Sequence, residues 1–201
     1  SAASDVYKRQ AMICSRFDQE SNEQLLSWCD VIVIGPGLGT SGASREREQW
    51  FLTAAAREKK PLILDADGLN LLAAHPQWYQ YLGEHVVLTP HIGEMSRLSG
   101  RTIQEIQHEI ADTALKCAAE TGSVCVLKDA CTVIADEKGQ MYLNLSGNSG
   151  MATAGSGDVL SGILAAVLCM YLKTEEQPPM VLKAALGVYL HGLCGDLAAC
   201  L

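Results

Sequence analysis

The sequence of 201 residues contains no block of lysine or arginine and no Cys-x-x-Cys pair. Acidic residues outnumber basic ones by 23 to 15, which gives a formal net charge of −8. A surface with this balance has no long-range attraction for nucleic acid or for an anionic membrane, so we expect neither as a partner. An anionic ligand must therefore be bound by local backbone dipoles and a few well-placed cations.

Two further absences narrow the class of protein. The longest apolar run, residues 159–172, is too short to cross a bilayer and includes Ser161 and Gly162. The eight cysteines are scattered, mostly within apolar segments, so we expect buried, reduced thiols, no zinc site and a cytoplasmic location. The length and a hydrophobic content of 48% suit one domain with a sizeable core.

Residues 1–10 carry neither apolar periodicity nor a motif. We expect them to be a disordered or vector-derived lead, followed by a single domain over residues 11–201. Apolar spacing continues to Leu201 without a helix cap, so we expect the natural domain to extend further.

Short apolar segments alternate with longer amphipathic ones along the chain. Buried strands are predicted near 31–34, 61–64, 85–89 and 124–127, with helices between them that include 44–59 and 102–121. A hairpin follows over 131–136 and 141–145, then one helix to about residue 172 and another from about residue 180. This order predicts an α/β fold in which helices cover both faces of a mostly parallel sheet, with a late β-hairpin.

A glycine-rich stretch, residues 148–158, leads into the first of these late helices, with Asp158 on the first turn of that helix. Glycine lets a ligand approach the main chain, and the N–H groups at a helix start attract anions. We therefore predict a phosphate site, with Asp158 as general base toward a neutral hydroxyl on a second substrate. A plain turn in which Asp158 caps the helix is an equal alternative, because neither established phosphate-loop signature matches.

Polar residues follow the predicted strands, at the sheet edge where parallel sheets bind ligands. The loop 35–41 has three glycines, more than a turn needs. Lys128 suits a nucleotide phosphate, although a solvated surface lysine is the alternative. Asp65 is a candidate for positioning a magnesium ion. For Asp67, a role at the site and simple capping of the next helix are equal alternatives.

A histidine and a glutamate lie three residues apart after the third predicted strand, in Pro90-His91-Ile92-Gly93-Glu94. We expect His91 to point into the cleft as a hydrogen-bonding group. Glu94 either acts on a cation or sits favourably near a helix start.

Together these motifs resemble one family, the ADP/ATP-dependent NAD(P)H-hydrate dehydratases of ribokinase-like fold. The resemblance runs from about residue 29 to the C-terminus. It rests on five ordered segments: VIVIGPGLGTS (31–41), LILDADGLNLL (62–72), LTPHIGE (88–94), VLKDACT (126–132) and GNSGMATAGSGDVLSGI (147–163).

The resemblance implies a three-layer αβα sandwich and a hydro-lyase that repairs hydrated NADH and NADPH. The S-epimer of the hydrate (NADHX or NADPHX) would be phosphorylated on its ring hydroxyl by ADP or ATP with Mg²⁺, and would then lose phosphate. Asp158 would be the catalytic base, the protein would be a homo-oligomer, and the magnesium ligands stay open. The substrate would contact Gly37, His91 and Asp158, and the nucleotide would contact Lys128, Asp129, Ala130, Cys131, Thr132, Gly155, Ser156 and Gly157.

The chain departs from the family pattern at two places. The family's opening strand–helix units are missing, and Asp129 stands where a glycine usually follows the nucleotide-binding lysine. Two alternatives stay open: a ribokinase-like kinase for a vitamin precursor or sugar, and a nucleotide-binding fragment without turnover.

Overall fold

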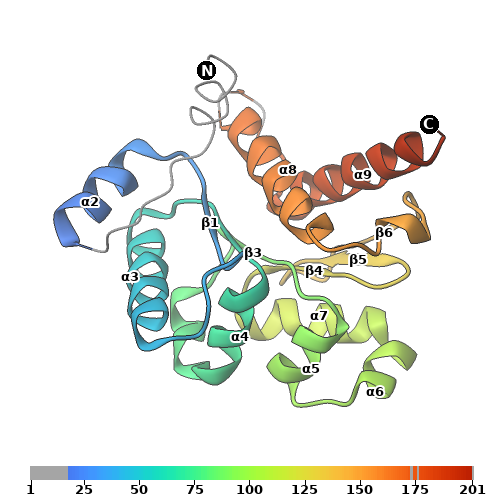
Figure 1. Ribbon diagram of the computed structural model, residues 1–201, viewed down its shortest axis with the longest axis horizontal. Coiled ribbons are helices and arrows are strands. Elements are labelled where there is room, and N and C mark those ends of the chain that lie inside the picture. Colours follow the sequence, from blue (N-terminus) through green and yellow to red (C-terminus); the bar gives the residue numbers. More distant parts are fainter. Residues whose placement is uncertain (1–17, 173, 176, 201) are drawn as a thin grey trace.

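A six-stranded sheet forms the centre of the computed structural model, which describes residues 18–172, 174, 175 and 177–200 (Figure 1). The expected lead at 1–10 lies outside these residues. The strands lie side by side in chain order; the first four are parallel and the last two form an antiparallel hairpin, as predicted. They are β1 (Ile32–Ile34), β2 (Leu62–Leu64), β3 (Val86–Leu88), β4 (Val124–Leu127), β5 (Thr132–Ala135) and β6 (Met141–Asn144).

Helices cover both faces of the sheet, and Figure 1 shows the two long C-terminal helices on the opposite side from the helices of the central part of the chain. One face carries α8 (Ser156–Tyr171) and α9 (Met180–Ala199). The other carries α3 (Gly42–Glu58), α4 (Ala66–Ala74), the 3₁₀ helix η1 (Pro76–Tyr81), α5 (Ile92–Ser99), α6 (Ile103–His108) and α7 (Ile110–Thr121), with α2 (Gln19–Trp28) beside α3.

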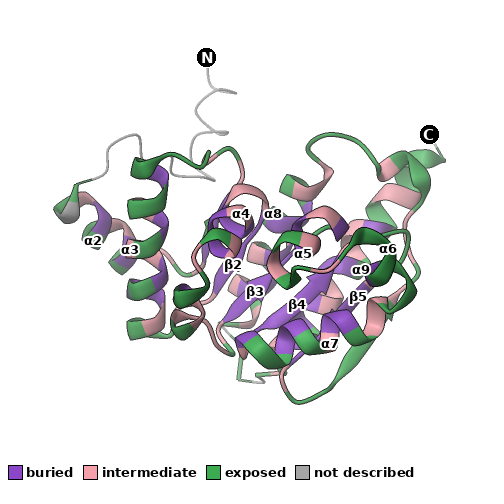
Figure 2. Ribbon diagram, turned by 90° about the horizontal axis from the view of Figure 1, so that it is seen from below, coloured by how far each residue is buried: buried purple, intermediate pink, exposed green. Residues whose placement is uncertain are grey.

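The sheet is buried on both faces because successive side chains of a strand point to opposite sides. In β2, Ile63 packs with the α8 and α9 cluster, whereas Leu62 and Leu64 pack with the helices opposite. Figure 2 shows the strands buried between helices whose outer surfaces are exposed. The predicted three-layer α/β arrangement is confirmed.

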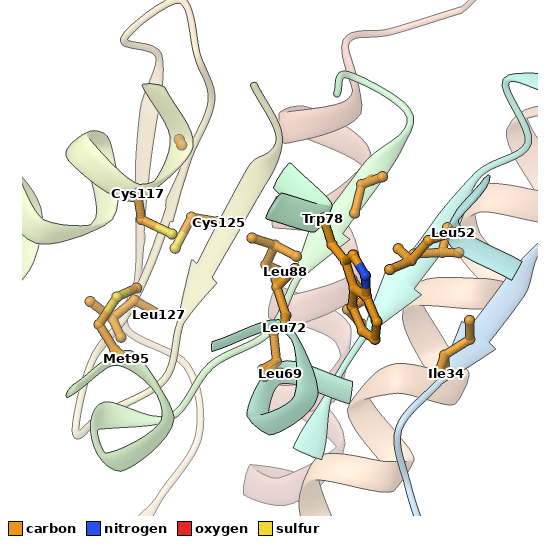
Figure 3. Packing of buried hydrophobic residues seen from close by; sticks show 14 of the residues in the cluster. Ile34, Leu52, Leu69, Leu72, Trp78, Leu88, Met95, Cys117, Cys125 and Leu127 are labelled. Carbon is orange, nitrogen blue, oxygen red and sulfur yellow. The ribbon is translucent and has the colours of Figure 1, made fainter. Parts of the chain in front are cut away.

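Trp78 of η1 anchors the larger of the two cores. Only 2% of its surface is exposed, and Figure 3 shows its ring between Leu52 of α3 and Leu72 of α4. His75 stacks on the ring, with 4.5 Å between centroids. The packing of Trp78 therefore joins η1, α3 and α4 on the same side of the sheet.

The cysteines only partly follow the expectation of buried thiols. Cys117 and Cys125 are buried and free, and Figure 3 shows their sulfur atoms facing each other. Cys131, Cys194 and Cys200 are free but exposed, so the expectation was wrong for these three. An apolar sequence neighbourhood does not bury a residue that lies in a loop or on the outer side of a helix.

The single helix predicted over 102–121 is in fact two helices, α6 and α7. Its predicted capping box is present: Thr102 Oγ1 accepts from the Glu105 N–H, and Glu105 Oε2 accepts from the Thr102 N–H. The break falls at Glu109 (φ −130°, ψ 45°), whose carboxylate accepts a 2.6 Å hydrogen bond from Arg101. Apolar spacing continues across the break, which is why the sequence did not reveal it.

By length and composition alone, α9 is apolar enough to cross a membrane. In the structure, Val181, Ala184 and Val188 of α9 pack in the core formed by α8 and the sheet. Gly187 lets the two helices approach closely, because a Cβ at this position would lie 2.7 Å from the Leu164 side chain. These contacts account for the buried apolar residues of the helix, whereas Leu182, Tyr189, Leu193 and Leu197 are exposed.

Candidate active site

A cavity of about 830 Å³ lies beyond the carboxyl ends of β3 and β4, between the β4–β5 connection, the start of α8 and the middle of α9. This is the edge of the sheet where parallel folds bind ligands. Of the residues predicted to form the site, the cavity brings together His91, Lys128, Asp129, Ala130, Thr132, Ser156 and Gly157.

Four other predicted residues are not among the described residues that line this cavity: Gly37, Cys131, Gly155 and Asp158. Asp158 is exposed on the first turn of α8, directly after the cavity-lining Gly157. The cap position of this helix is Gly155, with φ of +89°, so Asp158 is not the helix cap. Asp158 follows the lining residue Gly157 in sequence, but its own side chain is not part of the lining.

Lys128 is held in place by a buried carboxylate. Its Nζ lies 2.9 Å from Asp65 Oδ1, and only 21% of its side chain is exposed, so it is not a solvated surface lysine. The other Asp65 oxygen accepts a 2.8 Å hydrogen bond from Ser161 Oγ of α8. Asp65 therefore directs the Lys128 ammonium and links the ends of β2 and β4 to the first turns of α8.

The start of α8 lies directly against this ion pair. A Cβ on Gly157 would be 3.5 Å from Lys128 Nζ and 3.6 Å from Asp65 Oδ2. The first N–H groups of a helix have no intrahelical partner and carry the positive end of the macrodipole. The lysine and the helix start therefore converge on one volume that favours an anion.

Asp65 is less suited to magnesium than we expected, because both of its oxygens are engaged by Lys128 and Ser161. Among the described residues, no three His, Cys, Asp or Glu side chains gather closely enough to hold a metal ion. Mg²⁺ is commonly bound through substrate phosphates, water and only one or two carboxylates. The side chains around the cavity fit that mode of binding and not a cage made by the protein alone.

His91 lines the cavity while capping α5. Its Nδ1 accepts hydrogen bonds from the N–H groups of Gly93 (2.9 Å) and Glu94 (3.2 Å), and Glu94 Oε2 accepts from the His91 N–H (2.9 Å). A neutral ring with an accepting Nδ1 carries its proton on Nε2. Burial raises the pKa of Glu94, whose carboxyl serves the helix start. The helix-start role expected for Glu94 is the one observed.

The glycine loop after β1 is held by Asp67, which does not cap a helix. Asp67 Oδ2 accepts a 2.9 Å hydrogen bond from the Gly39 N–H, and the cap position of α4 is Asp65. Gly35 (φ +125°) packs so tightly that a Cβ there would lie 1.7 Å from the Asp65 carbonyl oxygen. This close approach explains one of the three glycines by packing and not by ligand contact.

The C-terminal half of α9 supports the glycine-rich stretch, a role that we did not predict from the sequence. Asp196 Oδ2 accepts a 2.8 Å hydrogen bond from the Gly147 N–H. Gly192 faces Ser146 so closely that a Cβ would lie 2.2 Å from its Oγ, and His191 Nε2 lies 3.4 Å from Ser156 Oγ. The available signal was the presence of His191 and Asp196 in the C-terminal half of a largely apolar helix.

Known proteins resemble this chain in sequence. Residues 3–200 match the sequence profile described as NAD(P)H-hydrate dehydratase. A bifunctional NAD(P)H-hydrate repair enzyme of Thermofilum pendens is 45% identical over 85% of this chain and 31% of its own length. The ADP-dependent (S)-NAD(P)H-hydrate dehydratase of Neisseria meningitidis is 36% identical over 82% of this chain and 54% of its own.

Solved structures share the fold as well. The ADP/ATP-dependent NAD(P)H-hydrate dehydratase of Bacillus subtilis, co-crystallised with ATP and Mg²⁺ and soaked with CoA, superposes with a TM-score of 0.66 at 34% identity, over 84% of this chain and 57% of its own. The predicted ribokinase-like fold is thereby confirmed. The chain spans about a third of the length of the bifunctional relatives and somewhat more than half of the others. The chain belongs to the NAD(P)H-hydrate dehydratase family.

Proposed function

We propose that this chain carries out the ADP- or ATP-dependent dehydration of the S-epimer of hydrated NADH and NADPH. The observation that carries the proposal is the convergence of Lys128 and the glycine-rich start of α8 on one cavity that His91 also lines. An anionic phosphate chain fits the first two groups. The hydrogen-bonding His91 suits the hydrate.

The nucleotide lies along Lys128–Thr132 and against Gly157, and the hydrate contacts Gly37, His91 and Asp158. In this proposal the two sets of contacts meet at the start of α8, with the terminal phosphate beside the ring hydroxyl of the hydrate. Gly155 and Ser156 directly precede Gly157, and we include them among the nucleotide contacts. Cys131 is included because it lies between Ala130 and Thr132, which both line the cavity.

Asp158 accepts the proton of the ring hydroxyl, and the hydroxyl oxygen attacks the terminal phosphorus. The bond from phosphorus to the bridging oxygen breaks, and its electron pair leaves with AMP or ADP. The first N–H groups of α8 and Lys128 stabilise the charge on the transferred group. The ring nitrogen then expels phosphate, and loss of a neighbouring proton restores the reduced nicotinamide.

Magnesium enters with the nucleotide in this proposal, because the described side chains do not form a cage for it. Asp129 is an exposed carboxylate that lines the cavity, and Asp158 is an exposed carboxylate that follows the lining residue Gly157. When bound, Mg²⁺ supplies charge neutralisation of the phosphates. We further propose that the protein works in the cytoplasm as a homo-oligomer, with neither nucleic acid nor membrane as a partner.

The test is to incubate the protein with hydrated NADH, MgCl₂ and either ADP or ATP, and to follow the absorbance of the reduced nicotinamide. Recovery of absorbance that depends on the nucleotide supports the proposal. Phosphorylation of a vitamin precursor or sugar without recovery identifies a kinase instead. Nucleotide binding with neither reaction identifies a binding fragment.

A further inference from the structure

One histidine of the cavity has no part in the reaction proposed above. His191 of α9 lines the cavity, is half-buried, and places Nε2 3.4 Å from the Ser156 hydroxyl at the first residue of α8. The same volume is bordered by Lys128 and Gly157. His191 therefore stands where a phosphate chain held by the lysine and the helix start would pass.

In the free protein the surroundings of His191 disfavour its charged form. Burial lowers its pKa below the ordinary value, a hydrogen bond with the Ser156 main chain acts in the opposite direction, and the charge of Lys128 lowers the pKa further. Two positive features, the ammonium and the start of α8, face the ring from the side of the sheet and of α8. An imidazolium is disfavoured beside them.

The other titratable groups around the cavity do not reverse this preference for the neutral form of His191. The cavity also carries His91 and Asp129, and Asp158 is exposed on the first turn of α8. Asp65 is paired with Lys128. On the helix of His191 itself, Asp196 is engaged by the Gly147 N–H.

We propose that binding of a nucleotide polyphosphate in this cavity is coupled to the uptake of one proton from solvent by His191, which then contacts the phosphate chain as an imidazolium. The inference rests on the proposed function, since it needs a nucleotide in the cavity. A polyphosphate brings several negative charges between the ring and Lys128. The field at the imidazole changes sign, and a nearby negative charge favours the protonated form.

Two properties follow from the coupling. The affinity for ADP rises as pH falls from the bound-state pKa of His191 to its free-state pKa, because the complex holds one more proton than the free protein. Adenosine has no phosphate and binds without this proton. Loss of the imidazolium contact weakens ADP binding by roughly ten- to a hundredfold below neutral pH, the usual range for a charge-assisted hydrogen bond.

The experiment is calorimetric titration of the protein with ADP and MgCl₂ at one pH near neutrality, in two buffers of different ionisation enthalpy. The buffer dependence of the heat reports the number of protons taken up. His191→Gln keeps a nitrogen near the position of Nε2 but cannot be protonated. His108→Gln is the matched control, because His108 is exposed on α6 and is not among the cavity residues.

We expect the original protein and His108→Gln to take up close to one proton more per ADP than His191→Gln, and to take up none with adenosine. Equal proton uptake in His191→Gln and the original protein overturns the inference while leaving the proposed function intact. Absence of any ADP binding to the original protein overturns the proposed function, and the inference with it.

A second measurement serves if His191→Gln does not fold. The chain has five histidines, so spectra of isotope-labelled histidine side chains resolve each titration in the original protein. One imidazole should become protonated when ADP is added and remain neutral with adenosine. If all five keep their protonation state on saturation with ADP, the inference is wrong.

Discussion

Lys128 and Asp65 form an ion pair across 63 residues of sequence, with Nζ and Oδ1 2.9 Å apart at the junction of two parallel strands and the start of α8. Asp65 is almost fully buried, at 2% exposure, and its other oxygen is bound by Ser161. The pair fixes the direction of the ammonium before any ligand arrives. It also supplies the counter-charge for the buried carboxylate of Asp65.

Replacing Lys128 by alanine should therefore lower both stability and nucleotide affinity. The buried Asp65 carboxylate loses its counter-charge, and we expect a loss of roughly 2–4 kcal/mol in the free energy of unfolding, measured by urea denaturation. ADP binding should weaken more than hydrate binding, because the ammonium faces the phosphate path.

Lys138→Ala is the matched control, since Lys138 is an exposed lysine in the β5–β6 turn whose ion pair with Glu137 is solvated. Its effect should stay below about 1 kcal/mol. Equal weakening of ADP and hydrate binding in Lys128→Ala would contradict the assignment of Lys128 to the nucleotide.

Asp158→Asn should abolish turnover and leave ADP binding largely intact. An amide keeps the shape of the side chain but cannot accept the hydroxyl proton, and loss of a general base usually costs about 10²–10⁴-fold in rate. The measurement pairs recovery of reduced nicotinamide with calorimetric ADP titration. Asp112→Asn, on the first turn of α7, is the control and should retain full activity. Loss of ADP binding in Asp158→Asn would mean that the carboxylate shapes the loop.

Gly192→Ala should displace the glycine-rich stretch. The added Cβ would lie 2.2 Å from Ser146 Oγ and 2.7 Å from the Ser146 carbonyl oxygen, so main chain must move. We expect roughly 1–3 kcal/mol of destabilisation and weaker ADP binding, measured by thermal unfolding and calorimetry.

Gly162→Ala provides the comparison within the neighbouring helix, because a Cβ there has no atom within 4 Å. This variant should gain up to about 1 kcal/mol from helix propensity. If both alanines had the same effect, the close contact between α9 and Ser146 would not be limiting.

Glu48 of α3 makes stability depend on pH. It is fully buried, neither carboxylate oxygen has a hydrogen-bond partner among the described residues, and burial together with the charge of Asp67 raises its pKa from 4.5 to about 8. Between these two values the folded protein binds more protons than the unfolded chain. Stability therefore falls as pH rises from about 4.5 to 8, by at most about 1.4 kcal/mol per pH unit.

Glu48→Gln should remove this slope and be the more stable protein at pH 8, by roughly 1–3 kcal/mol. The measurement is urea denaturation of both proteins across the pH range. Glu46→Gln, an exposed position of the same helix, should keep the slope of the original protein. Parallel pH profiles for the original protein and Glu48→Gln would show that the carboxyl is ionised in the fold.

The sequence was most informative where the structural signal is local. Runs of apolar β-branched residues placed the strands, because a parallel strand buried on both faces has no polar alternation. Thr102 and Glu105 marked a helix start, since their bond spans three residues. The break at Glu109 escaped detection because the apolar spacing of α6 continues into α7.

Within the site, residues that follow strands were predictable and their partners were not. Lys128 and His91 stand next to strand ends, where the topology brings them to one edge. The pairing of Asp65 with Lys128, the hold of Asp67 on Gly39 and the contacts of α9 with the glycine-rich stretch all join segments far apart in sequence. No spacing rule encodes such pairs, because they arise only when the layers assemble.

The chain-order arrangement of the strands has a consequence for synthesis on the ribosome. Each strand from β2 to β6 hydrogen-bonds to the strand made immediately before it, so the sheet can extend as the chain emerges. The glycine-rich stretch, by contrast, waits for Asp196 near the end of α9. A nascent chain thus acquires its sheet first, and the glycine-rich stretch gains the support of Asp196 only after α9 has been made.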